Sequence, residues 1–275
     1  MINLEQSVRS HYARPDLTRA ILDGVRRSGV ADETLTPVLL APVDEFHTAG
    51  RATTLKALAM TPIEAGMHVL DAGCGIGGTA RHLAAERGCQ VTGIDLTPEF
   101  IETARQLTKR MGLQHLCRFD QGSVTALPYA TASFDAAVSF HVAMNVKHRQ
   151  SFYQELARVL RPGAPLCLFD VLKGPGAGMR YPVPWAETPV TSFLKSREQT
   201  LALLAGAGFS LVAEDNLRRF AIDYFRQVFA QSAEAPPLGL HLLTGANSAE
   251  KFRNYAAALD AHQIEPVIMV ASRGG

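Results

Sequence analysis

Residues 68–82, HVLDAGCGIGGTARH, constrain the fold of this chain more than any other stretch. They begin with an apolar run that is typical of a buried parallel strand and that ends at Asp71. Gly73 and Gly75 then allow the backbone to turn sharply and to approach a ligand without a side-chain clash. A helix is predicted over residues 78–87. A strand, a glycine-rich turn and a helix in this order predict a nucleotide-binding crevice at the edge of a parallel sheet.

Two acidic residues indicate which kind of nucleotide this crevice binds. The glycines match the dinucleotide pattern G-x-G-x-x-G, so a nicotinamide dehydrogenase is one alternative. Asp71 argues against it, because a carboxylate beside the turn repels a pyrophosphate and attracts an ammonium group. Asp95 ends the next predicted strand, ~20 residues further on, where a carboxylate can accept both hydroxyls of a ribose. The pair therefore favours an aminoacyl-nucleoside.

The segments VLDAGCGIGG and VTGIDLTPEF resemble the first two motifs of the class I S-adenosylmethionine-dependent methyltransferases, and the resemblance covers residues 60–172. The flanking segments resemble the small-molecule members, including the glycine and sarcosine N-methyltransferase-like group. The resemblance implies an α/β fold, a doubly wound Rossmann-like sheet of seven strands with the last strand antiparallel. It also implies a helical cap over residues 1–60 and a cofactor-binding domain over residues 61–275. Within that domain we expect a proline- and glycine-rich lid at 173–193 and a helical insertion at 218–264.

The implied cofactor is S-adenosyl-L-methionine, with S-adenosyl-L-homocysteine as its product and no metal ion. Family members usually carry an acid at the position of Ser123, where it accepts the adenine amino group. A hydroxyl accepts this hydrogen bond more weakly, so the affinity for the cofactor is lower or Gln121 helps. Arg51 is expected to hold the methionine carboxylate. The residues expected to bind the cofactor are Asp71, Gly73, Gly75, Asp95, Leu96, Gly122, Ser123, His141 and Arg51.

Two histidines are candidates for catalysis. His141 lies at the carboxyl end of the fourth predicted strand, FDAAVSFHVAMNV, at the same sheet edge as Asp71 and Asp95, and His47 lies in the cap segment EFHTAGR. Either imidazole can take the proton that an amine or hydroxyl acceptor loses. The alternative for His141 is that it orients its loop through a backbone carbonyl. The residues expected to contact the acceptor, each of which can instead be a packing residue, are Tyr12, Phe46, Met144, Asn145 and Trp185.

The expected reaction is a direct in-line methyl transfer to a small-molecule acceptor, in which the protein mainly positions two partners. An amine acceptor is preferred, because the segments HVAMN and DEFH resemble those of methyltransferases that act on glycine and sarcosine. One alternative is an O- or C-methyltransferase of a natural-product pathway. Another is a non-catalytic protein that binds S-adenosylmethionine, which only the departure at Ser123 favours.

Composition excludes several other classes of function. The net charge of the 275 residues is +1 and the basic residues are scattered, whereas binding to nucleic acid requires a concentrated basic face. No apolar run reaches the length of a transmembrane helix, and the N-terminus lacks the apolar core of a signal peptide. The four cysteines show no C-x-x-C pairing and are expected to be reduced thiols. We therefore expect a cytoplasmic protein without membrane or nucleic-acid partners, and a homo-oligomer stays open.

Overall fold

A computed structural model describes residues 4–29, 35–231 and 236–275. Its centre is a seven-stranded sheet with the strand order β3-β2-β1-β4-β5-β7-β6. β7 runs antiparallel to both of its neighbours, β5 and β6, whereas the pairs among β1 to β5 are parallel. This arrangement confirms the predicted Rossmann-like sheet and its antiparallel last strand. The strands are β1 (His68–Ala72), β2 (Gln90–Asp95), β3 (Cys117–Gln121), β4 (Ala136–Phe140), β5 (Pro165–Lys173), β6 (Phe209–Asn216) and β7 (Ile264–Arg273).

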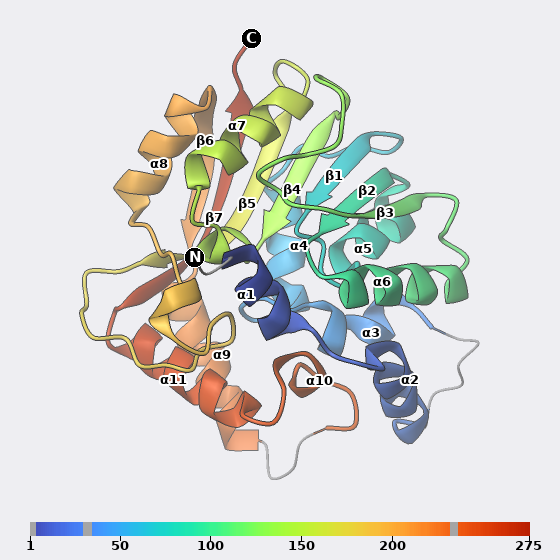
Figure 1. Ribbon diagram of the computed structural model, residues 1–275, viewed down its shortest axis with the longest axis vertical. Helices are drawn as coiled ribbons and strands as arrows, with labels where there is room; N and C mark the ends of the chain where they lie inside the picture. The colour runs from blue at the N-terminus through green and yellow to red at the C-terminus, as the bar shows by residue number, and fades with distance from the viewer. Residues whose placement is uncertain (1–3, 30–34, 232–235) are drawn as a thin grey trace.

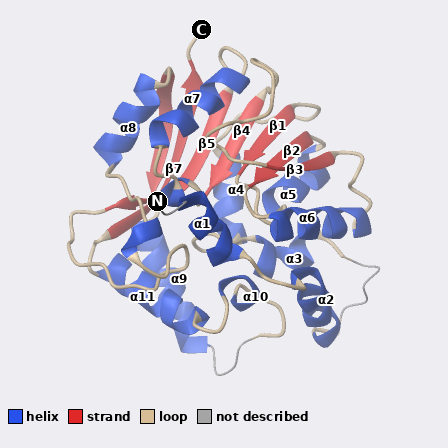
Figure 2. Ribbon diagram, viewed as in Figure 1, coloured by secondary structure: helices blue, strands red, loops and turns tan. Residues whose placement is uncertain are grey.

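Helices cover both faces of the sheet (Figures 1 and 2). Successive strand residues point to opposite faces, so Val69 and Leu70 of β1 belong to two different apolar clusters. Val69 packs in the cluster with α4 (Arg51–Ala59), α5 (Gly78–Arg87) and α6 (Pro98–Arg110). Leu70 packs in the cluster with α7 (Arg149–Val159) and α8 (Arg197–Gly206), which lie in front of the sheet in Figure 1. The helix predicted over residues 78–87 has these bounds in the structure.

A second group of helices gathers below the carboxyl ends of the parallel strands (Figure 1). Three of them come from the start of the chain and three from its last quarter. α10 packs against α2 as well as against α11, so the two ends of the chain enclose the same space. The division into a cap and a cofactor-binding domain stays a prediction. The helices of this group are α1 (Leu4–Tyr12), α2 (Leu17–Arg27), α3 (Pro37–Asp44), α9 (Arg218–Gln231), α10 (His241–Thr244) and α11 (Ser248–Asp260).

Two irregular segments follow the carboxyl ends of β4 and β5. β4 ends at Phe140, earlier than its apolar pattern indicates, and the short 3-10 helix η2 (Ala143–Asn145) follows. Residues 174–188 contain no helix or strand before the 3-10 helix η3 (Pro189–Thr191). None of the helices in the described ranges is both long and apolar enough to cross a membrane.

Candidate active site

A single large cavity of about 1700 Å³ opens at the carboxyl ends of the parallel strands. The order of the strands along the sheet reverses between β1 and β4, and doubly wound folds bind their ligands at such a point. Every residue that the sequence nominates for binding or catalysis lines this cavity, except Gln121, and their individual roles stay predictions. They are Tyr12, Phe46, His47, Arg51, Asp71, Gly73, Gly75, Asp95, Leu96, Gly122, Ser123, His141, Met144, Asn145 and Trp185.

The glycine-rich turn brings the tips of β1, β2 and β4 together. Gly73 and Gly75 have φ angles of 81° and 53°, in the left-handed region that favours glycine. A Cβ atom on Gly73 would lie 2.2 Å from the side chain of Val142, so the turn packs directly on the loop after β4. The backbone N–H of Gly75 donates to Oδ2 of Asp95, 3.0 Å away. The turn therefore holds the acid of the second strand beside that of the first.

Asp71 has a carboxyl oxygen with no protein partner. Its side chain is at the end of β1, the residue is 2% exposed, and Oδ2 accepts no hydrogen bond from the described residues. Burial, and then the charge of Asp95, raise the pKa of Asp71 to about 7. A buried polar atom of this kind loses free energy unless a ligand satisfies it. An ammonium group would supply the missing donors and the missing charge.

Asp95 is held by the backbone with room to accept more hydrogen bonds. Its Oδ1 accepts from the N–H of Thr97 at 2.8 Å, and its Oδ2 accepts from Gly75. Burial raises the pKa of Asp95, and these backbone N–H groups lower it in part. Each carboxylate oxygen has a second lone pair, so the group can also accept two ribose hydroxyls.

A carboxylate does lie beside Ser123, but it belongs to a residue of the first helix, Glu5. Ser123 Oγ donates to Oε1 of Glu5 at 2.6 Å, and Glu5 also lines the cavity. Glu5 lies in the first turn of α1 and is separated from Ser123 by 118 residues. No local spacing in the sequence connects the two, so sequence reasoning missed Glu5.

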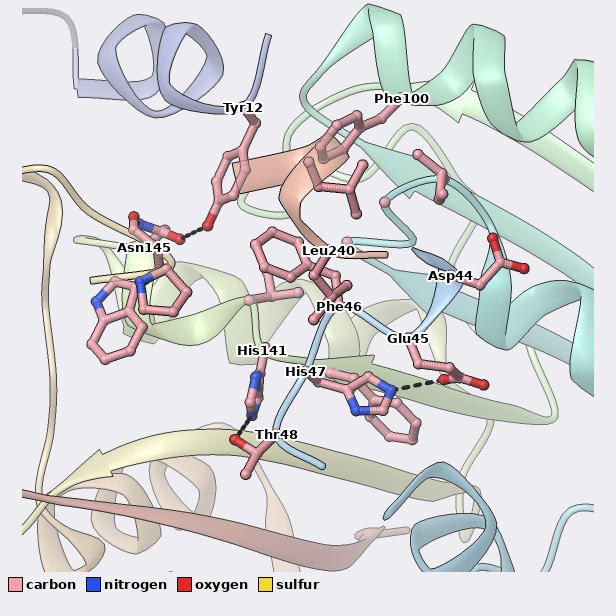
Figure 3. A pocket seen from close by; sticks show the side chains of 18 of the residues that line it. Tyr12, Asp44, Glu45, Phe46, His47, Thr48, Phe100, His141, Asn145 and Leu240 are labelled. Carbon is pink, nitrogen blue, oxygen red and sulfur yellow. Dashed lines mark hydrogen bonds and ion pairs between the residues drawn. The ribbon is translucent and has the colours of Figure 1, made fainter. Parts of the chain in front are cut away.

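His141 is held by a chain of two hydroxyl groups, and Figure 3 shows the first of them, on Thr48. Its Nε2 lies 3.3 Å from Thr48 Oγ1, which in turn hydrogen-bonds with Tyr255 Oη at 2.5 Å. The backbone of His141 has a φ of 54°, unusual for a residue other than glycine, and its N–H donates to the carbonyl oxygen of Phe169. Burial, and then the proximity of His47, lower the pKa of His141 well below its usual value. The imidazole is therefore neutral at pH 7. Thr48 and Tyr255 were not found from the sequence.

His47 has partners at both ring nitrogens. Its Nε2 lies 2.9 Å from Glu45 Oε2 and also 2.9 Å from Thr54 Oγ1, and Nδ1 lies 3.3 Å from Thr53 Oγ1. Burial raises the pKa of Glu45, but its hydrogen bond and ion pair with His47 and the hydrogen bond from Thr54 outweigh this, so the pKa is lowered. These contacts favour a positioning role for His47. Arg51, on the same segment, donates to Nδ1 of His82 at 3.2 Å.

The residues nominated for the acceptor link three parts of the chain. Tyr12 Oη of α1 donates to Asn145 Oδ1 at 2.8 Å, and Asn145 Nδ2 donates to the carbonyl oxygens of Trp185 and Thr191. Trp185 is only 2% exposed, and its indole N–H donates to Ser192 Oγ. These contacts anchor the segment after β5 to the first helix, while the same residues still form part of the cavity wall.

The described ranges contain no group of three or more histidine, cysteine or acidic side chains that could hold a metal ion. Their four cysteines are buried, unpaired thiols. The expected absence of a metal stays a prediction.

Comparison with known proteins identifies the family. A family model described as a methyltransferase domain matches residues 70–168. Norajmaline N-methyltransferase from Rauvolfia serpentina is 37% identical over 103 residues, 38% of this chain and 35% of its own length. An O-methyltransferase from Pyrenophora dematioidea is 30% identical over 183 residues, 65% of this chain and 67% of its own length. The chain therefore belongs to the class I S-adenosylmethionine-dependent methyltransferases, as the motifs around Asp71 and Asp95 predicted.

The solved structures show the same fold. The cyclase SpnF has a TM-score of 0.70 and 24% sequence identity, over 98% of this chain and 96% of that protein. Because SpnF is named a cyclase, the shared fold does not by itself define the reaction of this chain. The chain also spans only about a third of the length of the norajmaline enzyme, so that enzyme does not define the acceptor either.

Proposed function

We propose that this protein is an enzyme that transfers a methyl group from S-adenosylmethionine to a small-molecule acceptor. One observation carries the proposal: Asp71, which has a buried carboxyl oxygen without a hydrogen-bond partner, lines the same cavity as Asp95 on the neighbouring strand. Asp71 can bind a cation and the neighbouring Asp95 can accept hydrogen bonds from a diol, so together they suit a nucleoside that carries an amino acid.

The strand order supports one orientation of the cofactor. With its ammonium at Asp71 on β1 and its ribose at Asp95 on β2, the base extends toward Ser123 at the tip of β3. There the carboxylate of Glu5 is in reach of Ser123 and can accept the exocyclic amino group of adenine. Arg51, which also lines the cavity, is our candidate for the methionine carboxylate.

The cofactor would supply an electrophilic methyl group on a sulfonium: the lone pair of the acceptor would form the new bond to the methyl carbon, while the S–C bond breaks and its electron pair goes to the sulfur of S-adenosylhomocysteine, the leaving group. The protein holds the acceptor in line and excludes water from the cavity. His141 follows β4, next to the turn that contains Gly73, so its neutral ring can take the proton that leaves the acceptor. Thr48 and Tyr255 hold this ring in place through their hydroxyls.

The atom that receives the methyl group is an open part of the proposal. The matched relatives include an N- and an O-methyltransferase, and a neutral histidine serves an amine and a hydroxyl equally well. The amine that the cap segment favours therefore stays a prediction.

Calorimetric titration with S-adenosylhomocysteine tests the cofactor site. We expect micromolar binding to the wild-type protein and a ten- to hundredfold weaker affinity for Asp71→Asn, because a charge-assisted hydrogen bond contributes about 1.5–3 kcal/mol. Asp215→Asn is the control, since Asp215 lies on β6, outside the cavity, in an ion pair with Lys56. Absence of binding to the wild type, or equal binding to Asp71→Asn, would rule out the proposed site.

A further inference from the structure

We propose that the methyl acceptor is a large, uncharged and mostly apolar molecule, and not a small zwitterionic amine. The inference rests on the proposed function, and it concerns the part of the cavity that lies beyond the cofactor-binding residues. Three independent properties of this part carry it: its size, the chemistry of its wall and the distribution of its charges.

The cavity is too large for the cofactor and a small amine. Its volume is about 1700 Å³, whereas sites for one drug-sized ligand usually measure about 300–1,000 Å³. S-adenosylmethionine is itself a ligand of drug size, and its expected contacts lie at the strand tips and the glycine-rich turn, with Arg51 and Glu5 beside them. The remaining space accommodates a second ligand at least as large as the cofactor.

The wall of this remaining space is apolar. It is formed by α9, α10 and α11 together with α1, and Figure 3 shows Leu240, just before α10, beside Phe46 in the middle of the cavity. A ligand that covers such a wall gains about 25 cal/mol for each Å² of apolar surface removed from water. A glycine-sized acceptor would leave most of it uncovered. The apolar lining residues of α9 to α11 include Tyr224, Phe225, Val228, Phe229, Leu243 and Phe252.

The acidic side chains that line the cavity belong to one part of the sequence. The carboxylates among its described lining residues come from the first 95 residues of the chain, and all of them except Asp71 have a side-chain or backbone partner named above or an ion pair with Arg81. The described lining residues between 140 and 255 include no aspartate or glutamate, but they do include Lys147 and Arg253. A buried ammonium group against α9 to α11 would find no carboxylate among the described lining residues of these helices, and burying an unpaired charge is strongly unfavourable. The acceptor is therefore uncharged where it lies against these helices. The acids are Glu5, Asp44, Glu45, Asp71 and Asp95.

Nile red, a neutral polycyclic dye, tests the wall without any need for turnover. Fluorescence titration of the full chain, saturated with S-adenosylhomocysteine, should give a blue-shifted emission and micromolar binding. Two phenylalanines of α9 form a matched pair, because Phe229 lines the cavity and is 46% exposed, whereas Phe220 is 45% exposed and does not line it. We expect Phe229→Asp to weaken dye binding at least ~fivefold through loss of apolar contact and Phe220→Asp to leave it unchanged.

Turnover separates this inference from the proposed function. Formation of S-adenosylhomocysteine is measured with estradiol and other neutral hydroxylated polycycles, and in parallel with glycine and sarcosine. Turnover of the polycycles but not of the two amino acids supports the inference. Turnover of glycine or sarcosine, or dye binding that Phe229→Asp leaves unchanged, overturns it while the proposed methyl transfer stands. Failure of the wild type to bind S-adenosylhomocysteine in the calorimeter overturns the proposed function instead.

Discussion

Among single residues, Asp71 has the environment most sensitive to pH. Burial raises its pKa to about 7, so in the ligand-free protein the carboxyl group is half protonated at neutral pH. A proton and an ammonium group compete for this carboxylate, and the ligand therefore binds better as the pH rises through 7. The pKa of Asp71 is higher in the folded than in the unfolded chain. Its contribution to the free energy of unfolding is therefore fully present below the ordinary pKa of an aspartate and is lost as the pH rises through about 7.

We expect the affinity for S-adenosylhomocysteine to increase roughly tenfold between pH 6 and pH 8, since the ionised fraction of a group with a pKa of about 7 rises by that factor. Calorimetry across this range measures it. Asp71→Asn should show weaker binding with a flat profile. A profile equally steep in the variant would assign the titration to another group.

Glu5 is the residue whose role is easiest to separate from general stability, because it is exposed on the first turn of α1. We expect Glu5→Ala to weaken binding of S-adenosylhomocysteine by about five- to thirtyfold through loss of a carboxylate acceptor. The variant should also lose the preference for the adenine ligand over S-inosylhomocysteine, which lacks the amino group. Glu102→Ala, on the exposed side of α6, is the control. An unchanged preference would remove Glu5 from the adenine site.

At the scale of secondary structure elements, a buried ion pair joins α3 to α5. Arg81 is fully buried and its Nη2 lies 2.6 Å from Asp44 Oδ1, while its Nη1 donates to the carbonyl oxygen of Ile76. Burial raises the pKa of Asp44 to about 6 even though Arg81 lowers it. Gly78 permits this packing, because a Cβ atom there would lie 2.6 Å from the backbone oxygen of Asp44.

Removing one partner of this pair leaves a buried carboxyl group without its counter-charge. We expect Arg81→Ala to lower the free energy of unfolding by about 3–5 kcal/mol, measured by urea denaturation. The matched control is Arg19→Ala, because Arg19 pairs with Asp16 on the surface with 71% of its side chain exposed. This change should cost less than about 1 kcal/mol. If both variants lost the same free energy of unfolding, burial of the ion pair would not affect its contribution to stability.

The contact between Tyr12 and Asn145 fixes the first helix over the cavity. We expect Tyr12→Phe to remove about 1 kcal/mol of this attachment and to speed amide hydrogen exchange in α1 about fivefold. Tyr129→Phe is the control, since the hydroxyl of Tyr129 donates to Asp120 away from the cavity. Unchanged exchange in α1 would show that other contacts hold the helix.

At the scale of the whole molecule, one ligand should stabilise both ends of the chain, because both ends line one cavity. S-adenosylhomocysteine at one hundred times its dissociation constant adds about 2.7 kcal/mol, which corresponds to an increase in Tm of about 5–10 °C. Scanning calorimetry measures this shift. Asp95→Asn should show a smaller shift at the same ligand concentration, and an equal shift would exclude Asp95 from the site.

Short sequence patterns were sufficient to predict much of the fold. The strand, turn and helix over residues 68–87 follow from an apolar run and from glycines in adjacent positions, all within one segment. Asp71 and Asp95 follow from the same reasoning, because parallel strands bring their carboxyl ends to one edge. The end of strand β4 was harder to predict. The chain departs from the strand at His141, which has a positive φ, and no sequence pattern indicates this conformation.

The sequence by itself determined the sheet, the family and the two acids, because their signals lie in short segments with fixed spacing. Only the tertiary structure decided which distant side chains complete the site. Glu5 meets Ser123 across 118 residues, and Thr48 meets Tyr255 across 207. The size and the charge distribution of the cavity likewise arise where helices from both ends of the chain meet, and such long-range packing leaves no local periodicity to read.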